Sequence, residues 1–145
     1  MKQYDPNRVW ERVQNTSVPD TQSMEPLMGI LAWKVQVLRH LSGKLPAPQA
    51  AEARTLSRRF QQQLACLKGM QILISGTAPT IRPEAIPRDP PDLLLRQCYA
   101  QALRLRTEYE ARRSDPAYGH IFRALANDLP EQSRSILELL GTLAK

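Results

Sequence analysis

Hydrophobic residues recur at helical spacing in the second half of the chain. Between residues 92 and 141 the apolar positions lie three or four apart on two segments, which meet at Asp115 and Pro116. This spacing places the apolar side chains of each segment on one face, as packing in a helix bundle requires. The predicted faces are Leu95, Cys98, Ala102, Leu105 and Tyr109 on the first helix, and Phe122, Leu125, Leu129, Gln132, Ile136 and Leu139 on the second.

The same pattern predicts two helices in the first half of the chain. One runs from about Glu25 to Ser42 and the other from about Gln49 to Ser75, and each is followed by a glycine. Glycine commonly follows the last turn of a helix, and the short connection makes the two helices antiparallel neighbours. The apolar face predicted for the second of them is Leu56, Phe60, Gln63, Leu67, Met70 and Ile74.

Residues 1–24 are predicted to form an extension of the bundle. Asp5 followed by Pro6 has the pattern of an N-cap and a first helical residue, so a short helix carrying Trp10 should follow. Residues 14–23 are polar and are interpreted as a loop. Residues 25–145 then form the bundle, and residues 1–145 make one domain.

The helix predicted over residues 25–42 is apolar on nearly all sides. A single bundle core needs only one apolar stripe, so the surplus predicts a second contact. A homodimer formed through Met28, Trp33 and Val35, or a contact with a related protein, would cover this surface. The amino-terminal helix, through Trp10, is an equally good candidate.

Residues 76–91 contain five prolines and cannot be helical. At ~3.3 Å per residue this segment reaches ~50 Å, whereas a helix of the predicted size is ~40 Å long. It can therefore run the length of the bundle and bring the third helix parallel to the second. A flexible linker between two helical hairpins is the alternative, although the proline content favours a stiff connection.

The third and fourth helices share a start signal, an aspartate followed by a proline. Asp89 is the predicted cap of the third helix, which continues to about Arg113. Pro130 falls inside the fourth helix, where it removes a backbone hydrogen bond, so a kink or restart is predicted over residues 127–131. Gly141 is predicted to end this helix.

Composition and charge limit the classes of function. The net charge is +6, but the basic residues are spread over several helices, so nucleic-acid binding is not favoured. Cys66 and Cys98 lie on or beside apolar faces and outside any CxxC pattern, so both are predicted to be buried free thiols. The apolar run over residues 27–38 is too short to span a membrane, and the amino terminus has no apolar signal core. A cytoplasmic protein without membrane contact is therefore expected.

The helix order, the long connection and two segments resemble the ferritin-like superfamily, and the small bacterial rubrerythrin-type domains most closely. The segments are CYAQALRLRTEYEARRSDPAYGHIF and EQSRSILELLG, and the resemblance extends over residues 25–143. It implies an all-α, ferritin-like four-helix bundle with a long crossover between helices 2 and 3 and a short amino-terminal helix. Members of this family bind two iron or manganese ions, with a Glu from each of helices 1 and 3 and a Glu-x-x-His from each of helices 2 and 4.

No metal ligand occupies the matching positions of this chain. The pattern Glu-x-x-His occurs nowhere, because Val37 precedes His40 by three residues and Ala117 precedes His120. Both histidines are therefore interpreted as ordinary surface or helix-end residues. The matching positions are Leu31 or Lys34 on the first helix, Phe60 and Gln63 on the second, Ala102 on the third, and Leu129 and Gln132 on the fourth.

The resemblance and these substitutions predict a non-catalytic relative that has lost its di-iron site. No catalytic residue, metal or cofactor is expected, and the protein would act through protein interaction, as a dimer or beside a related ferritin-like protein. Gln63 and Gln132 stand at the two former histidine positions and are predicted to hydrogen-bond to each other or to a water molecule.

Three alternatives remain open at this stage. The first is a rubrerythrin-type di-metal oxidoreductase with atypical ligands drawn from Glu108, His120, Glu131 and the two cysteines. The second is a bundle that binds nucleic acid through its positive surface. The third is a site for a small apolar ligand near Ala102, where the small side chain leaves room.

Overall fold

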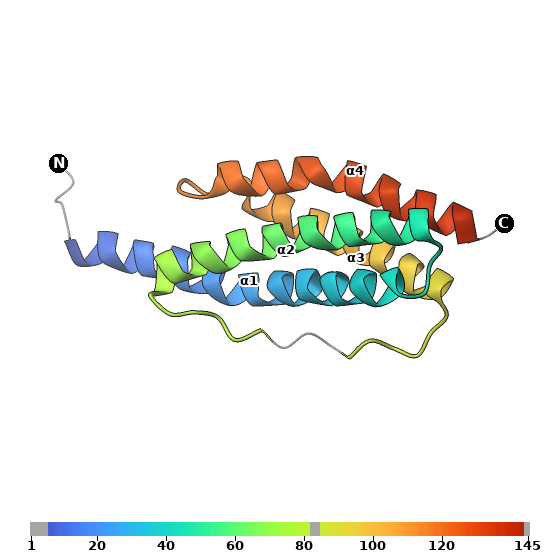
Figure 1. The fold of residues 1–145 in the computed structure, drawn as a ribbon. Coiled ribbons are helices and arrows are strands. Elements are labelled where there is room, and N and C mark those ends of the chain that lie inside the picture. Colours follow the sequence, from blue (N-terminus) through green and yellow to red (C-terminus); the bar gives the residue numbers. More distant parts are fainter. Residues whose placement is uncertain (1–5, 82–84, 144–145) are drawn as a thin grey trace.

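The computed structural model describes the backbone of residues 6–81 and 85–143, and the side chains of these ranges from residue 24 onward. The described residues form four helices and no strand (Figure 1). They are α1 (Pro6–Ser42), α2 (Ala47–Ser75), α3 (Pro91–Arg112) and α4 (Gly119–Leu143).

The four helices form an elongated bundle. Helix α1 packs against α2 and α3, and α4 packs against α3 and α2, so that α1 and α4 lie on one diagonal and α2 and α3 on the other. All neighbouring pairs run antiparallel, while α2 and α3 run parallel (Figure 1). The predicted all-α four-helix bundle with one long crossover is therefore confirmed.

The crossover, residues 76–90, is called the strap here. Its described residues, 76–81 and 85–90, lie on the α1 side of the bundle and join the end of α2 to the start of α3 at opposite ends of the bundle (Figure 1). Ile81 and Ile86 are half-buried against the hydrophobic core. The predicted cap at Asp89 is wrong, because Pro90 is the N-cap of α3 and no side chain caps this end. Asp89 Oδ2 instead accepts a hydrogen bond from Gln97 Nε2 at 3.1 Å.

One predicted helix boundary is confirmed, at the end of α2, whereas α4 begins at Gly119 and not at the predicted Pro116. Gly76 follows α2 with a φ of 77°, a conformation that glycine adopts without strain, and its N–H donates to the Ile72 carbonyl at 2.8 Å. Asp115 Oδ1 accepts hydrogen bonds from the backbone N–H groups of Ala117 and Tyr118 at 2.9 and 2.8 Å, which caps the first turn leading into α4.

Three predicted breaks do not occur. Helix α1 is continuous through residues 14–23, where a polar loop was expected, because polar side chains do not prevent backbone hydrogen bonding and glycine is absent before Gly29. Helix α4 does not restart at residues 127–131, and it continues past Gly141 to Leu143. The side chain of Trp10 lies outside the described residues.

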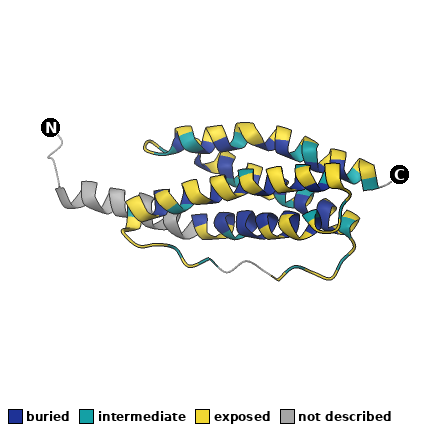
Figure 2. Ribbon diagram, in the orientation of Figure 1, coloured by how far each residue is buried: buried dark blue, intermediate teal, exposed yellow. Residues whose placement is uncertain are grey.

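The hydrophobic core lies along the bundle axis, and residues 24–42 of α1, the part whose side chains are described, are mostly buried (Figure 2). All residues predicted for the apolar faces of α3 and α4 are buried, as are those of α2 except the half-buried Ile74. Met28, Trp33 and Val35 are 0%, 8% and 3% exposed within one chain. A dimer is therefore not needed to cover them. Among the described residues, no helix is long and apolar enough to cross a membrane.

Candidate functional site in the bundle interior

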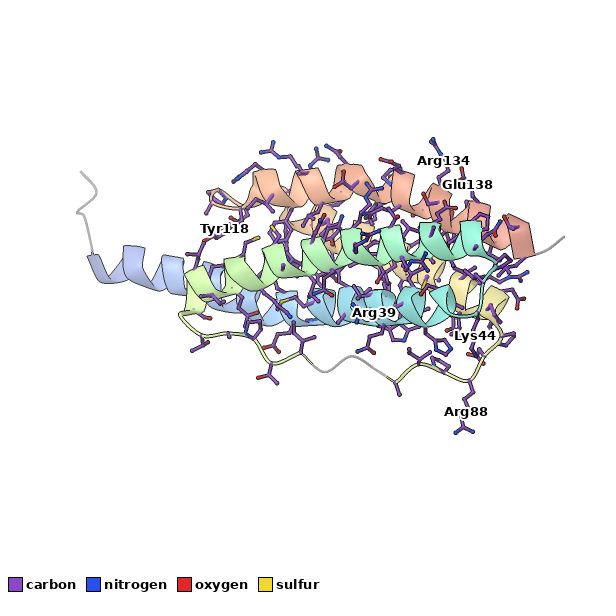
Figure 3. The ribbon with its side chains drawn as sticks, in the orientation of Figure 1. Arg39, Lys44, Arg88, Tyr118, Arg134 and Glu138 are labelled. Atoms are coloured by element: carbon purple, nitrogen blue, oxygen red, sulfur yellow. The ribbon has the colours of Figure 1, made fainter. Side chains whose placement is uncertain are left out.

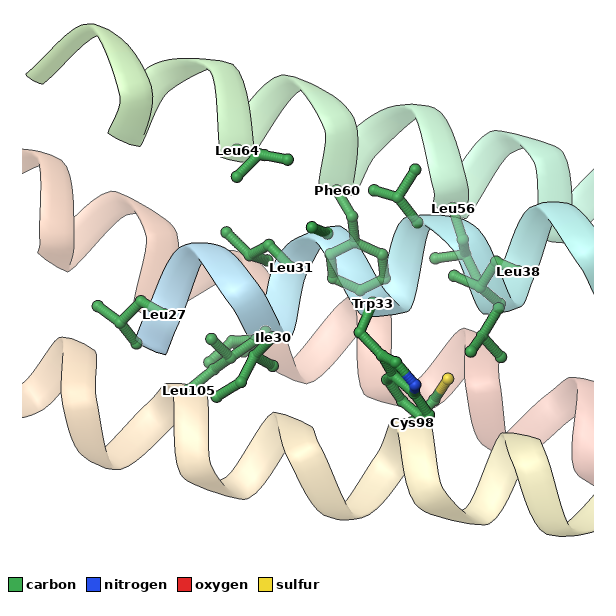
Figure 4. Close-up of a cluster of buried hydrophobic side chains, with 14 of the residues drawn as sticks. Leu27, Ile30, Leu31, Trp33, Leu38, Leu56, Phe60, Leu64, Cys98 and Leu105 are labelled. Carbon is green, nitrogen blue, oxygen red and sulfur yellow. The ribbon is translucent and has the colours of Figure 1, made fainter. Parts of the chain in front are cut away.

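The positions singled out by the sequence come from all four helices and all face the interior. None is more than 8% exposed. Figure 4 shows two of them, Leu31 of α1 and Phe60 of α2, next to each other within the core, with Cys98 of α3 nearby. The full set is Leu31, Lys34, Phe60, Gln63, Ala102, Leu129 and Gln132.

Contacts between neighbouring helices show which of these residues lie at the same height along the bundle axis. Ser57 Oγ of α2 donates to the Val35 carbonyl of α1 at 3.0 Å, and Lys34 Nζ lies 4.5 Å from the centre of the Phe60 ring. The rings of Tyr109 and Phe122 are 6.3 Å apart and set the register of α3 against α4.

From these registers we infer that the interior positions form two adjacent layers about one helical turn apart. Arg59 of α2 pairs with Glu131 of α4 at 3.5 Å, which brings these two helices together near the same height along the bundle. The first layer contains Lys34, Phe60, Cys98 and Gln132, and the second contains Leu31, Gln63, Ala102 and Leu129.

Lys34 is the most unusual residue of the first layer. Its side chain is fully buried, and its ammonium group has no hydrogen-bond partner among the described residues. The face of the Phe60 ring attracts the cation, a contact worth roughly 0.5–2 kcal/mol. Burial lowers the pKa of Lys34 from 10.5 to about 8, and the nearby Cys98 opposes this shift slightly. The core therefore contains a cation held by an aromatic face and not by an anion.

The glutamines do not form the predicted pair. Among the described residues, neither polar atom of the Gln132 side chain has a hydrogen-bond partner, and Gln63 Oε1 also lacks one.

This interior does not fit a di-metal centre. Iron and manganese in such bundles require bridging carboxylates and imidazole nitrogens. The seven positions supply aliphatic and aromatic groups, two amides and an ammonium. Within residues 24–81 and 85–143, no group of three or more His, Cys, Asp and Glu side chains lies close enough to hold a metal ion.

The atypical ligands considered from the sequence are not brought together. Glu131 pairs with Arg59 on the surface, and Glu108 accepts from Arg112 Nη1 at 2.7 Å. His120 is exposed, as is His40, which confirms the interpretation of both histidines. Cys98 is buried as predicted, but Cys66 is exposed, because it lies beside the apolar face of α2 and not on it.

Sequence reasoning missed a buried charged group near the end of α3. Arg112, near the end of α3, is 8% exposed and lies 5.9 Å from the Phe122 ring centre. Beside it, burial raises the pKa of the Tyr109 hydroxyl, which has no hydrogen-bond partner in the described part of the chain. The spacing Leu105, Tyr109, Arg112 continues the apolar face of α3 and was the available signal. Lys34, which the sequence had already singled out, lies likewise between Leu31 and Leu38 on the buried face of α1.

Ala102 also borders a hollow, but on the outside of the bundle. The hollow encloses about 530 Å³ between α3 and α4. Ala102 and Leu129 form part of its lining, so this pair separates the interior layers from the outer face.

Comparisons of the chain with models of protein families, with curated proteins and with solved structures find no match.

Proposed function

We propose that this protein is a ferritin-like bundle, related to rubrerythrin-type domains, that has lost its di-metal site and acts through protein interaction. The observation that carries the proposal is the filling of the interior. Residues from all four helices converge there in two layers, as a di-metal site would require, yet they include no carboxylate or imidazole. A core of this kind stabilises the bundle but offers no metal-based chemistry.

The layers also support a choice for the position left open on the first helix. In the family pattern, helix 2 corresponds to helix 4 and helix 1 to helix 3, so Phe60 corresponds to Leu129 and Gln63 to Gln132. Phe60 and Leu129 lie in different layers, so corresponding residues lie in opposite layers. Ala102 of α3 lies in the layer of Leu129, and its counterpart on α1 must therefore lie in the layer of Phe60. Lys34 meets this condition because its Nζ lies over the Phe60 ring, whereas Leu31 belongs to the other layer.

Restoring the ligands tests this assignment. A variant carrying K34E, F60E, Q63H, A102E, L129E and Q132H places a Glu or His at each proposed position. We expect it to bind a pair of Co(II) ions per chain, with the visible absorption of a protein-bound cobalt site, because the family's ligand set is then complete. Equilibrium dialysis and absorption spectroscopy measure both quantities.

The control is the four-glutamate variant that keeps Gln63 and Gln132, which we expect to bind cobalt much more weakly. Circular dichroism establishes that both variants are helical. If the variant with six substitutions folds but binds no cobalt, the positions do not converge as proposed. Separately, near-stoichiometric iron, manganese or zinc bound inside the purified wild-type bundle would contradict the loss of the site.

A further inference from the structure

The outer face of α3 and α4 carries a groove, defined here by the lining of the 530 Å³ hollow. Its volume lies within the range of ~300–1,000 Å³ typical of binding clefts. The groove extends along α3 from Tyr99 to Glu110, which is about 16 Å at 1.5 Å per residue. The described residues of the strap lie on the α1 side of the bundle and do not cover the groove (Figure 1).

Part of the groove lining is apolar, although it faces solvent. Leu103 of α3 is 57% exposed and Leu137 of α4 is 47% exposed, and both line it. The small side chains of Ala102 and Ala126 line the bottom of the groove and add to its depth. Pro130 also lines the groove and supplies no N–H to the Ala126 carbonyl, so this backbone acceptor has no partner in the regular pattern of α4.

The charges around the groove are mostly positive. Arg106 and Arg134 line it, and neither forms an ion pair within the described part of the chain. Arg134 points away from the bundle into solvent (Figure 3). An adjoining hollow adds Arg113 and Arg123, and the single acid shared by both hollows, Glu110, is paired with Arg113 at 2.9 Å.

We propose that this groove binds an acidic amphipathic helix of a partner protein. Apolar side chains one turn apart on such a helix would pack between Leu103 and Leu137, and its glutamates and aspartates would face Arg106 and Arg134. A second copy of this chain is a poorer occupant, because each copy carries a net charge of +6. The inference rests on the proposed function and identifies the surface and partner class through which it is exercised.

The test uses a fluorescein-labelled helical peptide of about 15 residues, with leucines at positions i, i+3 and i+7 and glutamates elsewhere. Fluorescence anisotropy measures its affinity for the full-length protein. We expect L103S/L137S to weaken binding about tenfold or more, because the apolar anchors are lost. The matched control L73S changes a leucine on α2 that is 77% exposed and lies outside the groove, and it should bind as the wild type does.

A charge exchange identifies the partner's chemistry. R106E/R134E should weaken binding of the acidic peptide and strengthen binding of a peptide with lysines in place of the glutamates. The control R54E changes an exposed arginine of α2 and should alter neither affinity. Equal affinity of L103S/L137S and the wild type would overturn the groove assignment. Self-association that L103S/L137S abolishes, or duplex DNA that displaces the peptide, would overturn the choice of partner. These outcomes are independent of the cobalt experiment, which tests the loss of the metal site.

Discussion

Lys34 determines the electrostatics of the core at the scale of a single residue. An ammonium group buried without an anion or a hydrogen bond is unfavourable, and the Phe60 ring offsets only part of that energy. A shift in pKa from 10.5 to about 8 corresponds to roughly 3 kcal/mol between the charged and neutral forms. Burying Lys34 therefore lowers the stability of the folded chain relative to an uncharged side chain of similar size.

Replacing Lys34 with methionine should stabilise the protein. Methionine keeps the length of the side chain and removes the buried charge, so we expect the free energy of unfolding at pH 7 to rise by about 1–3 kcal/mol. Urea denaturation followed by circular dichroism measures it. Lys44→Met, at an exposed position after α1, is the control and should change stability little. A destabilised Lys34→Met variant would indicate that the ammonium has a favourable partner.

The same residue predicts how stability depends on pH. Lys34 has a lower pKa in the folded chain, so between pH 8 and 9 the unfolded chain retains a proton that the folded chain releases. The free energy of unfolding should therefore rise with pH in this window, by about 1 kcal/mol, and Lys34→Met should abolish the rise. Above pH 9 Cys98 acts in the opposite direction, because burial raises its thiol pKa from 9.0 to about 12. A wild type and variant with identical pH dependence would contradict this assignment.

At the scale of the helix, Pro130 interrupts the hydrogen bonding of α4 without ending it. The residue is exposed, and its ring lies on the groove side of the helix. The apolar face on either side of it remains buried through Leu125, Leu129 and Ile136. Packing of this face against the bundle therefore maintains a helix that the local backbone alone would disfavour.

Pro130→Ala should stabilise α4. The substitution supplies the missing N–H to the Ala126 carbonyl and replaces the residue of lowest helix propensity with the one of highest, so we expect a gain of about 1–3 kcal/mol. Thermal and urea unfolding measure it. Pro48→Ala is the matched control, because Pro48 lies in the first turn of α2, where its missing N–H is not needed. A loss of stability in Pro130→Ala would show that α4 is bent away from ideal geometry at this point.

At the scale of the whole molecule, the strap determines the helix arrangement. It connects the end of α2 to the start of α3 at the opposite end of the bundle (Figure 1). A shorter connection would place α3 antiparallel to α2 and give a different order of neighbours. The length of this segment thus selects the topology, and its prolines limit the conformations that compete with it.

Shortening the strap should prevent the native fold. Deleting four residues reduces its reach to about 36 Å, less than the ~43 Å length of α2. We expect the deletion variant to lose cooperative unfolding or to exchange helices between copies, seen as a changed elution volume in size-exclusion chromatography. A Gly/Ser segment of the original length is the control, and it should keep the native elution volume but lose about 2–4 kcal/mol. Native elution and stability in the deletion variant would show that the strap need not span the bundle.

The sequence by itself determined the helix faces, because a repeat of 3.6 residues is a local property of the chain. It also determined where α2 ends at Gly76 and that Asp115 caps the turn before α4, since both depend on nearby backbone groups, although α4 itself begins later than predicted, at Gly119. The absence of metal ligands at the matching positions likewise needed no coordinates. Local pattern failed where it treated polarity as a helix break, at residues 14–23.

Only the tertiary structure decided which polar groups are buried and what they meet. The register between helices places Lys34 over Phe60 and leaves Gln63 and Gln132 without a hydrogen bond to each other, and no single helix contains that information. Packing of α1 against its neighbours within one chain covers Met28, Trp33 and Val35, so its apolar surface did not require a partner. The groove of α3 and α4 likewise exists only where two helices meet. The physical reason is that periodicity acts within one helix, whereas burial and pairing depend on contacts between residues far apart in the chain.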